Sequence, residues 1–208
     1  MRFAKEGALY LLFFGGLSLI SWALSPVVSL IFLSFFCFIL FFFRDPERPI
    51  VLSETVFLSP ADGRVLEIRK IAAGDFFKEP CVCVRIFLSI FDVHVNRAPM
   101  AGRIRDIRYR AGAFHMAFDK KAFEENENNL LIFDGPGFPF AVRQIAGKIA
   151  RKIVCYCKIG ERLEQGQRLG FIRFGSGCEL YMPDTAEVQV SVGQKVAGGV
   201  SVIACLKK

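Results

Sequence analysis

The chain has 208 residues, of which 53% are hydrophobic, and it carries a formal charge of +7 at pH 7 with a pI near 9.2. This length allows one domain with its own core and a smaller segment beside it. The positive charge suits a partner with an anionic surface, either lipid or nucleic acid. Because the sequence contains no nucleic-acid-binding motif, we expect lipid and no nucleic acid.

Two uncharged apolar runs, residues 8–24 and 27–43, open the chain and are separated only by Ser25 and Pro26. Each run has about the minimum length of a helix that spans a bilayer. A helix that is apolar on all sides must be buried on all sides, which a water-soluble domain of this size can hardly do twice. The pattern predicts a membrane-associating hydrophobic helical hairpin over residues 1–48.

Basic residues flank this hairpin and are absent from its centre: Arg2, Lys5, Arg44 and Arg48. By the positive-inside rule, both ends should lie on the cytoplasmic side of the cell membrane. Two alternatives stay open. One is a signal peptide that ends near residues 23–25 and precedes a single span. The other is a hairpin that dips into one leaflet, because both runs are short.

From residue 51 onward the pattern is mostly strand-like, and glycine and proline punctuate it at short intervals. We therefore expect residues 49–208 to form a mainly β domain of the sandwich or barrel-like kind. The best candidate for a helix in this part is the short segment 119–127, although its acid-rich end has the character of a solvated loop. The expected strands are VLEIRKI, CVCVRIFLSI, RIRDIRYR, LLIFDG, FAVRQIAG, KIVCYCKIG, RLGFIRFG, EVQVSVG and VSVIACL.

A weak internal repeat begins at Gly166-Gln167 and is echoed at Gly193-Gln194, each followed by a basic and an apolar residue. Such turns resemble the hammerhead sheets of biotinyl and lipoyl carrier domains. The lysine that those carriers modify has no counterpart at a hairpin tip here, so the likeness concerns architecture alone.

The seven cysteines do not have the spacing of a disulfide framework. The pairs Cys81/Cys83 and Cys155/Cys157 lie two residues apart in strand-like runs, where both members share one face. Zinc sites need wider cysteine spacing and further ligands. We expect buried structural thiols in a reducing compartment and no metal.

Three polar positions between apolar runs could carry chemistry: Asp62, His94 and Ser176. Taken singly, an Asp before Gly is usually a turn residue, a lone His at a strand end is usually structural, and Gly175-Ser176 is usually a turn between strands. Taken together, they supply an acid, a base and a nucleophile. The Gly-x-Ser-x-Gly elbow of many serine hydrolases is absent.

Six segments in order resemble the short bacterial and archaeal type of phosphatidylserine decarboxylase proenzyme. They extend from about residue 42 to residue 183 and are FFRDPER, SPADGRV, IFLSIFDVHVNRAPMAG, KAFEENENN, QIAGKIARKIVCY and GQRLGFIRFGS. Six ordered segments are far more specific than any single motif.

The resemblance implies that the proenzyme cuts itself between Gly175 and Ser176. The β chain, 1–175, and the α chain, 176–208, would remain associated, and Ser176 would become a pyruvoyl group. The ketone of this group would form a Schiff base with the amine of phosphatidylserine and withdraw electrons as CO₂ leaves, yielding phosphatidylethanolamine. No metal or external cofactor is implied, and a homo-oligomer is left open.

The resemblance assigns His94 as the base that activates Ser176 and Asp62 as the carboxylate that orients it. Longer relatives show His-x-x-His, whereas Arg97 stands at the second histidine position here. His115 is an alternative base, although its surroundings read as apolar packing. Short relatives usually follow Gly-Ser with a basic residue, where this chain has Gly177.

Several arginines are candidates for binding the substrate phosphate: Arg85, Arg97, Arg143 and Arg173. Two other functions use the same sequence features. A membrane-anchored serine hydrolase or self-cleaving protease would use Asp62, His94 and Ser176 but leave the serine intact. A non-catalytic, membrane-anchored β domain of the carrier type would never be cut.

Overall fold

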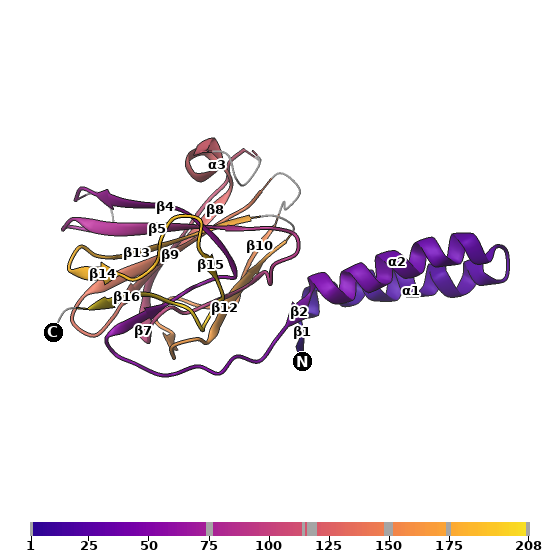
Figure 1. The fold of residues 1–208 in the computed structure, drawn as a ribbon, viewed down its shortest axis with the longest axis horizontal. Coiled ribbons are helices and arrows are strands. Elements are labelled where there is room, and N and C mark those ends of the chain that lie inside the picture. The colour runs from indigo at the N-terminus through magenta and orange to yellow at the C-terminus, as the bar shows by residue number, and fades with distance from the viewer. Residues whose placement is uncertain are drawn as a thin grey trace. The chain divides into compact units, whose positions relative to one another are not determined.

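A computed structural model describes residues 2–73, 77–113, 115, 120–147, 152–173 and 176–206. The chain divides into two compact units, Met1–Glu47 and Arg48–Lys208. Figure 1 shows the first unit as two long helices and the second as a set of curved strands. The described residues are therefore mainly β, with a helical segment at the N-terminus.

The first unit consists of two helices whose ends are joined by a short strand pair. Ser18 Oγ lies 3.2 Å from Ser29 Oγ, and Ser29 Oγ donates to the Ser18 carbonyl at 2.8 Å, so the serines link the helices. Pro26 begins the second helix, where its missing N–H costs no hydrogen bond. The elements are β1 Arg2–Phe3, the 3₁₀ turn η1 Lys5–Gly7, α1 Ala8–Trp22, α2 Pro26–Phe42 and β2 Arg44–Asp45.

The helices of this unit have polar residues between them and apolar residues outside. Ser18 and Ser29 are 8% and 4% exposed, whereas Leu9 and Leu19 are each 79% exposed. This is the reverse of the arrangement in a water-soluble helical protein, where leucines fill the interior. Within the described residues, no helix reaches the combined length and hydropathy of a membrane span.

The second unit contains one eight-stranded sheet and two three-stranded sheets among the described residues. The large sheet has the order β11-β7-β8-β9-β13-β5-β4-β15, and the smaller ones are β10-β12-β6 and β14-β16-β3. The strands are β3 Val56–Leu58, β4 Gly63–Ile71, β5 Cys81–Leu88, β6 Val95–Arg97, β7 Gly102–Arg110, β8 Asn128–Asp134, β9 Pro139–Ile145, β10 Ile153–Cys155, β11 Arg162–Leu163, β12 Arg168–Ile172, β13 Ser176–Pro183, β14 Ala186–Val188, β15 Lys195–Val196 and β16 Val202–Leu206.

The three sheets of this unit enclose one apolar core, which includes Phe57 of β3, Leu169 of β12 and Leu180 of β13. We call the face of the large sheet toward this core the inner face. Side chains alternate along a strand, so Cys178, Leu180 and Met182 point inward. Glu179 and Tyr181 point to the opposite, outer face, where Tyr181 packs with Cys83 and Ala141.

Strand β13 occupies the middle of the large sheet, although the sequence pattern did not predict it. It pairs with β5 from Ser176↔Leu88 to Pro183↔Cys81, and with β9 from Gly177↔Ile145 to Tyr181↔Ala141. A glycine and a glutamate interrupt its apolar alternation, which is why the pattern was missed. The expected strands do form in part or in full, and the segments KIVCYCKIG and EVQVSVG are extended only at Ile153–Cys155 and Ala186–Val188.

The segment 119–127, the best helix candidate of this part of the chain, does contain a short helix, although its acid-rich end was expected as a loop and the helix continues to Glu125. Helix α3 covers Lys120–Glu125, and its Ala122 and Phe123 are buried against Ile145 and Leu66. Two apolar side chains among charged ones are enough to hold one helical turn against the outer face of the sheet.

The internal repeat corresponds to two turns with the same hydrogen bonds. Gln167 N donates to the Glu164 carbonyl at 3.1 Å, and Gln194 N donates to the Ser191 carbonyl at 3.1 Å. Each glutamine also accepts, through Oε1, from the backbone N–H three residues earlier. Gly166 and Gly193 have φ of +77° and +88°, as the third position of a type II turn requires.

Candidate active site

Ser176 begins β13, and its side chain lies on the inner face of the large sheet. The residue is completely buried, and Oγ has no hydrogen-bond partner among the described residues. A serine that only closes a turn would bond to nearby backbone, so this hydroxyl is available for chemistry. Gly175, the predicted residue on the other side of the cleaved bond, lies outside the described residues.

His94 is also completely buried, at the end of the segment that connects β5 to β6. Its Nδ1 donates to the Asp92 carbonyl at 2.9 Å. Because a carbonyl oxygen can only accept, the proton resides on Nδ1, and Nε2 carries the lone pair of the neutral ring. This tautomer suits a general base that acts through Nε2.

Asp92 shapes the segment that presents this histidine, a role that sequence reasoning missed. Its carboxylate accepts from Ser89 N at 2.9 Å and from Ser89 Oγ at 2.7 Å. These two hydrogen bonds join Ser89 and Asp92 across the turn. They fix the position of the Asp92 carbonyl, which accepts from His94 Nδ1. The Ser-x-x-Asp spacing in the sequence is the signal that could have revealed this turn.

The two ends of this connecting segment flank the start of β13. Leu88, at the end of β5, is the cross-strand partner of Ser176. Ile172 N donates to the His94 carbonyl at 3.2 Å, and Ile172 lies four residues before Ser176. The segment that ends at His94 is therefore paired at one end with Ser176 and bonded at the other to Ile172, although these residues are far apart in the sequence.

Asp62 lies in the turn between β3 and β4 and has two hydrogen-bond donors. Arg48 Nη2 donates to Oδ2 at 2.7 Å, and Gly198 N donates to Oδ1 at 2.7 Å. Burial raises the pKa of Asp62 above its ordinary value of 3.8, although the Gly198 N–H and the Arg48 charge oppose this change. Arg48 was missed as a partner, and its position in the FFRDPER segment is the signal that could have identified it.

The turn that carries Asp62 lies against β6, the strand that follows His94. Arg97 N, in β6, donates to the Pro60 carbonyl at 2.9 Å. Gly63 closes this turn with φ of +152°, and a Cβ there would lie 2.1 Å from the Phe87 carbonyl oxygen, so only glycine fits. Orientation of His94 by Asp62 stays a prediction.

The two residues considered as stand-ins for a second histidine have different surroundings. Arg97 is buried, and its Nη1 donates to the Gly166 carbonyl at 3.0 Å. His115 is partly exposed, and its Nε2 lies 2.7 Å from Glu125 Oε2. His115 thus pairs with a carboxylate of α3, whereas its apolar neighbours in GAFHMAF, which were expected to pack around it, lie mostly outside the described residues.

Two of the arginines considered for phosphate binding are already paired with a buried carboxylate. Glu179 is completely buried on the outer face and contacts Arg85 Nε at 2.5 Å, Arg69 Nη2 at 3.5 Å and Arg143 Nη2. Tyr181 donates its hydroxyl to the same carboxylate. We call these five residues the Glu179 cluster, and it makes Arg85 and Arg143 structural.

The glycine that replaces the usual basic residue after Ser176 also has a structural reason. Gly177 faces outward beneath α3, where a Cβ would lie 2.9 Å from Phe123 Cε1. The Arg85 guanidinium lies 4.6 Å from the centre of the same ring. A basic side chain at position 177 would displace Phe123 and add charge beside the Glu179 cluster.

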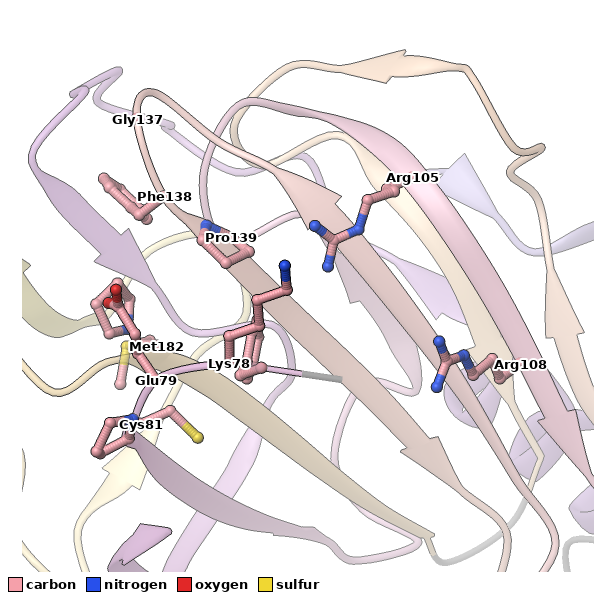
Figure 2. Close-up of a pocket in the computed structure, with 12 residues that line it drawn as sticks. Lys78, Glu79, Cys81, Arg105, Arg108, Gly137, Phe138, Pro139 and Met182 are labelled. Carbon is pink, nitrogen blue, oxygen red and sulfur yellow. The ribbon is translucent and has the colours of Figure 1, made fainter. Parts of the chain in front are cut away.

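A pocket of about 580 Å³ lies at the opposite end of β13 from Ser176. Met182 and Pro183 line it, which places it about 20 Å along the strand from Ser176. Figure 2 shows Lys78 reaching over this pocket from the segment before β5, and Arg105 and Arg108 from β7. It is therefore separate from the Ser176 site.

The cysteines do not contribute a competing nucleophile beside Ser176. All seven are free thiols, and Cys178, the nearest in sequence, is completely buried. Burial, together with the Glu179 charge, raises the pKa of the Cys178 thiol, so it stays protonated. Across the described residues, no three His, Cys, Asp or Glu side chains gather as a metal site would require.

The chain is similar to known proteins over nearly its whole length. The family model described as phosphatidylserine decarboxylase matches residues 35–204. A phosphatidylserine decarboxylase proenzyme of Carboxydothermus hydrogenoformans is 44% identical over 98% of this chain and 96% of its own. Proteins of the same name from Magnetococcus marinus and Desulfotalea psychrophila are 42% and 39% identical, over 98% and 96% of this chain and 95% and 94% of theirs.

Proposed function

The chain belongs to the phosphatidylserine decarboxylase family, and on this premise we propose that it converts phosphatidylserine to phosphatidylethanolamine and CO₂. The observation that carries the proposal is the Ser176 hydroxyl, which is buried, unbonded among the described residues, and next to the segment that presents His94.

Self-cleavage begins with attack of Ser176 Oγ on the carbonyl carbon of Gly175. His94 Nε2 takes the hydroxyl proton, a task for which its Nδ1–H bond to the Asp92 carbonyl orients it. The carbon–nitrogen bond then breaks, the Ser176 nitrogen takes a proton, and an ester joins the two segments. A base then removes the Cα proton of Ser176 and the Cβ–O bond breaks, which releases Gly175 as a free carboxylate at the end of the β chain. The resulting dehydroalanine tautomerises to an imine, and water hydrolyses it to ammonia and the pyruvoyl group.

The described residues fit a pyruvoyl group at this position. The group supplies a ketone that condenses with the substrate amine and accepts the electron pair released as CO₂ leaves. Ser176 and His94 are both completely buried. Their burial keeps bulk water away from the reacting atoms. We assign Asp62 as the carboxylate that stabilises charge near His94, supported by the contact of its turn with β6.

We propose that the two products of cleavage remain associated. The α chain would supply β13, which pairs with β5 on one edge and β9 on the other. It would also supply β16, which pairs with β3 of the β chain, and β15, which pairs with β4. Separating the chains would break the large sheet in its middle.

We also propose that the N-terminal helices hold the enzyme in the cell membrane, with the catalytic unit on the cytoplasmic side. The exposed leucines of α1 and the serines buried between the helices support this placement, because hydrocarbon solvates leucine and serine pairs join helices in lipid. The flanking Arg2, Lys5, Arg44 and Arg48 favour the cytoplasmic side. On the same basis, residues 1–48 form the membrane-associating part and residues 49–208 the catalytic part.

For the fold of the catalytic part we propose a barrel-like sandwich with hammerhead features. The three sheets around one core support the barrel-like sandwich. The two matched glycine–glutamine turns support the hammerhead features.

The decisive experiment is the intact mass of purified wild type beside the Ser176→Ala and Ser176→Thr variants. Wild type should give two chains, the smaller beginning with a pyruvoyl group. Ser176→Ala should stay uncut and inactive, because no hydroxyl can attack. Ser176→Thr keeps a nucleophile, and any α chain that it yields should begin with a keto group heavier by one methylene. Cleavage of the alanine variant at the same bond would contradict the mechanism.

The same spectra separate the alternatives. A serine hydrolase or self-cleaving protease would leave the Ser176 side chain intact at the new terminus. A non-catalytic β domain would give one uncut chain.

Deletion of residues 2–43 tests the membrane part. Activity on phosphatidylserine in bilayers should fall far more than activity on dispersed short-chain substrate, because the helices raise the concentration of enzyme at the lipid. Equal losses on both substrates would reject this role.

A further inference from the structure

Three buried amide side chains form a line of hydrogen bonds that crosses from the large sheet to the β10-β12-β6 sheet. Asn129 Nδ2 donates to Gln144 Oε1 at 3.2 Å, and Gln144 Nε2 donates to Asn96 Oδ1 at 2.9 Å. All three are at most 4% exposed. We call this line the amide relay.

The amide relay has a direction, and it ends in an unsatisfied donor. Each amide accepts through its oxygen and donates through its nitrogen to the next, so the last nitrogen, Asn96 Nδ2, has hydrogens to offer. This atom is buried and has no hydrogen-bond partner among the described residues. A buried N–H₂ without a partner destabilises the folded protein, so the presence of this group in the interior calls for a function.

The amide relay ends beside Ser176. Gln144 is the cross-strand partner of Cys178, and Ser176 lies two residues before Cys178 on the same face. Diagonal neighbours of this kind are about 7–8 Å apart, within reach of a long side chain. Asn96 also lies two residues after His94 in an extended segment. Ser176 Oγ and Asn96 Nδ2 are thus two buried groups without a partner among the described residues, and Gln144 links the positions of both: it bonds to Asn96 and is the diagonal neighbour of Ser176.

The Gln144 side chain reaches Asn96 through space that is open because residue 170 is a glycine. A Cβ at Gly170, the cross-strand partner of Asn96 in β12, would lie 2.6 Å from Gln144 Nε2 and 2.4 Å from the Val154 carbonyl oxygen. Any larger residue there would push the Gln144 amide away from Asn96. The relay therefore depends on residues from four separate segments of the chain.

We propose that Asn96 Nδ2 is the donor that stabilises the oxyanion of self-cleavage, a role that rests on the proposed function. When Ser176 Oγ bonds to the preceding carbonyl carbon, the carbonyl π electrons move to oxygen, and the Oγ proton goes to His94. That carbon is bonded to the Ser176 nitrogen, so the charge develops at the same end of β13. An oriented donor there stabilises the charge without reorganisation, and Gln144 provides the orientation.

The test is the pH dependence of self-cleavage in Asn96→Asp, an isosteric change that keeps an acceptor for Gln144 Nε2. The ionised carboxylate cannot donate, so at high pH cleavage should be about 100-fold slower than in wild type. At low pH the introduced carboxyl is protonated and can donate again, so the ratio of variant to wild-type rate should rise as pH falls. A purely structural role for Asn96 would not produce this recovery.

Asn128→Asp is the matched control, because Asn128 is a buried asparagine of the same strand as Asn129 whose side chain donates locally, to the Asn126 carbonyl at 2.8 Å. Its cleavage rate should stay within about threefold of wild type at every pH, and circular dichroism should show that all variants fold. A pH-independent ratio for Asn96→Asp, or equal slowing in Asn128→Asp, would overturn the role of Asn96. Neither outcome would affect the proposed function, which the intact masses of wild type and Ser176→Ala test separately.

Discussion

Strand β13 carries two polar groups, three residues apart, whose surroundings are opposite in kind. On the inner face, Ser176 Oγ is buried without a partner among the described residues. On the outer face, Glu179 is equally buried but contacts Arg69, Arg85, Arg143 and Tyr181. One strand thus carries a hydroxyl with no partner among the described residues and a carboxylate that four side chains contact.

The comparison shows how one strand can carry both a reaction and the anchor that survives it. In the proposed mechanism, cutting before Ser176 would remove the covalent attachment of β13, and its contacts would then hold it. An ion pair on a completely buried carboxylate is costly to form but very costly to break from one side. The Glu179 cluster would therefore keep the register of the strand whose serine is proposed to react.

The largest expected effect is on the inner face. His94→Gln removes the base but keeps a polar side chain of similar size, and it should slow self-cleavage by about 10²–10⁴-fold. Time courses of cleavage after synthesis would measure this. His115→Gln is the control and should change the rate less than about twofold, because His115 pairs with Glu125. Strong slowing in the control alone would reassign the base.

The second largest expected effect is a loss of folding stability when Glu179, on the outer face, is replaced. Glu179→Gln leaves three arginines without their shared carboxylate, so the free energy of unfolding should fall by about 3–5 kcal/mol. The measurement belongs in the Ser176→Ala background, where one covalent chain unfolds. Glu67→Gln removes the other, half-exposed partner of Arg85 and should cost less than about 1 kcal/mol. Equal losses in the two variants would show that burial of Glu179 does not matter.

A smaller effect should come from the residue between the two groups. Gly177→Ala places a methyl group against Phe123 and should cost about 1–2 kcal/mol in the Ser176→Ala background. Adding Phe123→Leu should make the combined loss smaller than the sum of the single losses, since the smaller side chain makes room. Strict additivity would mean that this contact does not limit position 177.

The smallest effect is a pH dependence at Asp62. Its folded-state pKa lies above the ordinary 3.8, mainly through burial, so the protonated form favours folding. The contribution is complete below pH 3.8 and is lost as the pH rises through the raised folded value. The stability of wild type relative to Asp62→Asn should therefore decrease over this window, as denaturant titrations would show. An increase over the same window would mean that Arg48 outweighs burial.

Much of the site was accessible from the sequence because its residues lie in short, distinctive segments. Ser176, His94 and Asp62 were named from such segments, and both ends of the segment that ends at His94 contact chain at or near Ser176. Asp92, the pairing of Arg48 with Asp62, and the amide relay were not predicted, because a buried amide or a turn carboxylate looks like any surface polar residue until its partner is known. Gln144, the partner of Asn96, lies 48 positions away in the chain, and Arg85, a partner of Glu179, lies 94 positions away.

By itself, the sequence determined the two apolar helices, the mainly β character of the rest, and the family. Local periodicity and ordered motifs carry this information, since each depends on residues close together in the chain. Only the tertiary structure decided that β13 is a central strand, that its glutamate is buried, and that the Asn96 amide is left with a hydrogen to donate. A buried polar group is stable only with partners from distant segments, and no local pattern records which segments those are.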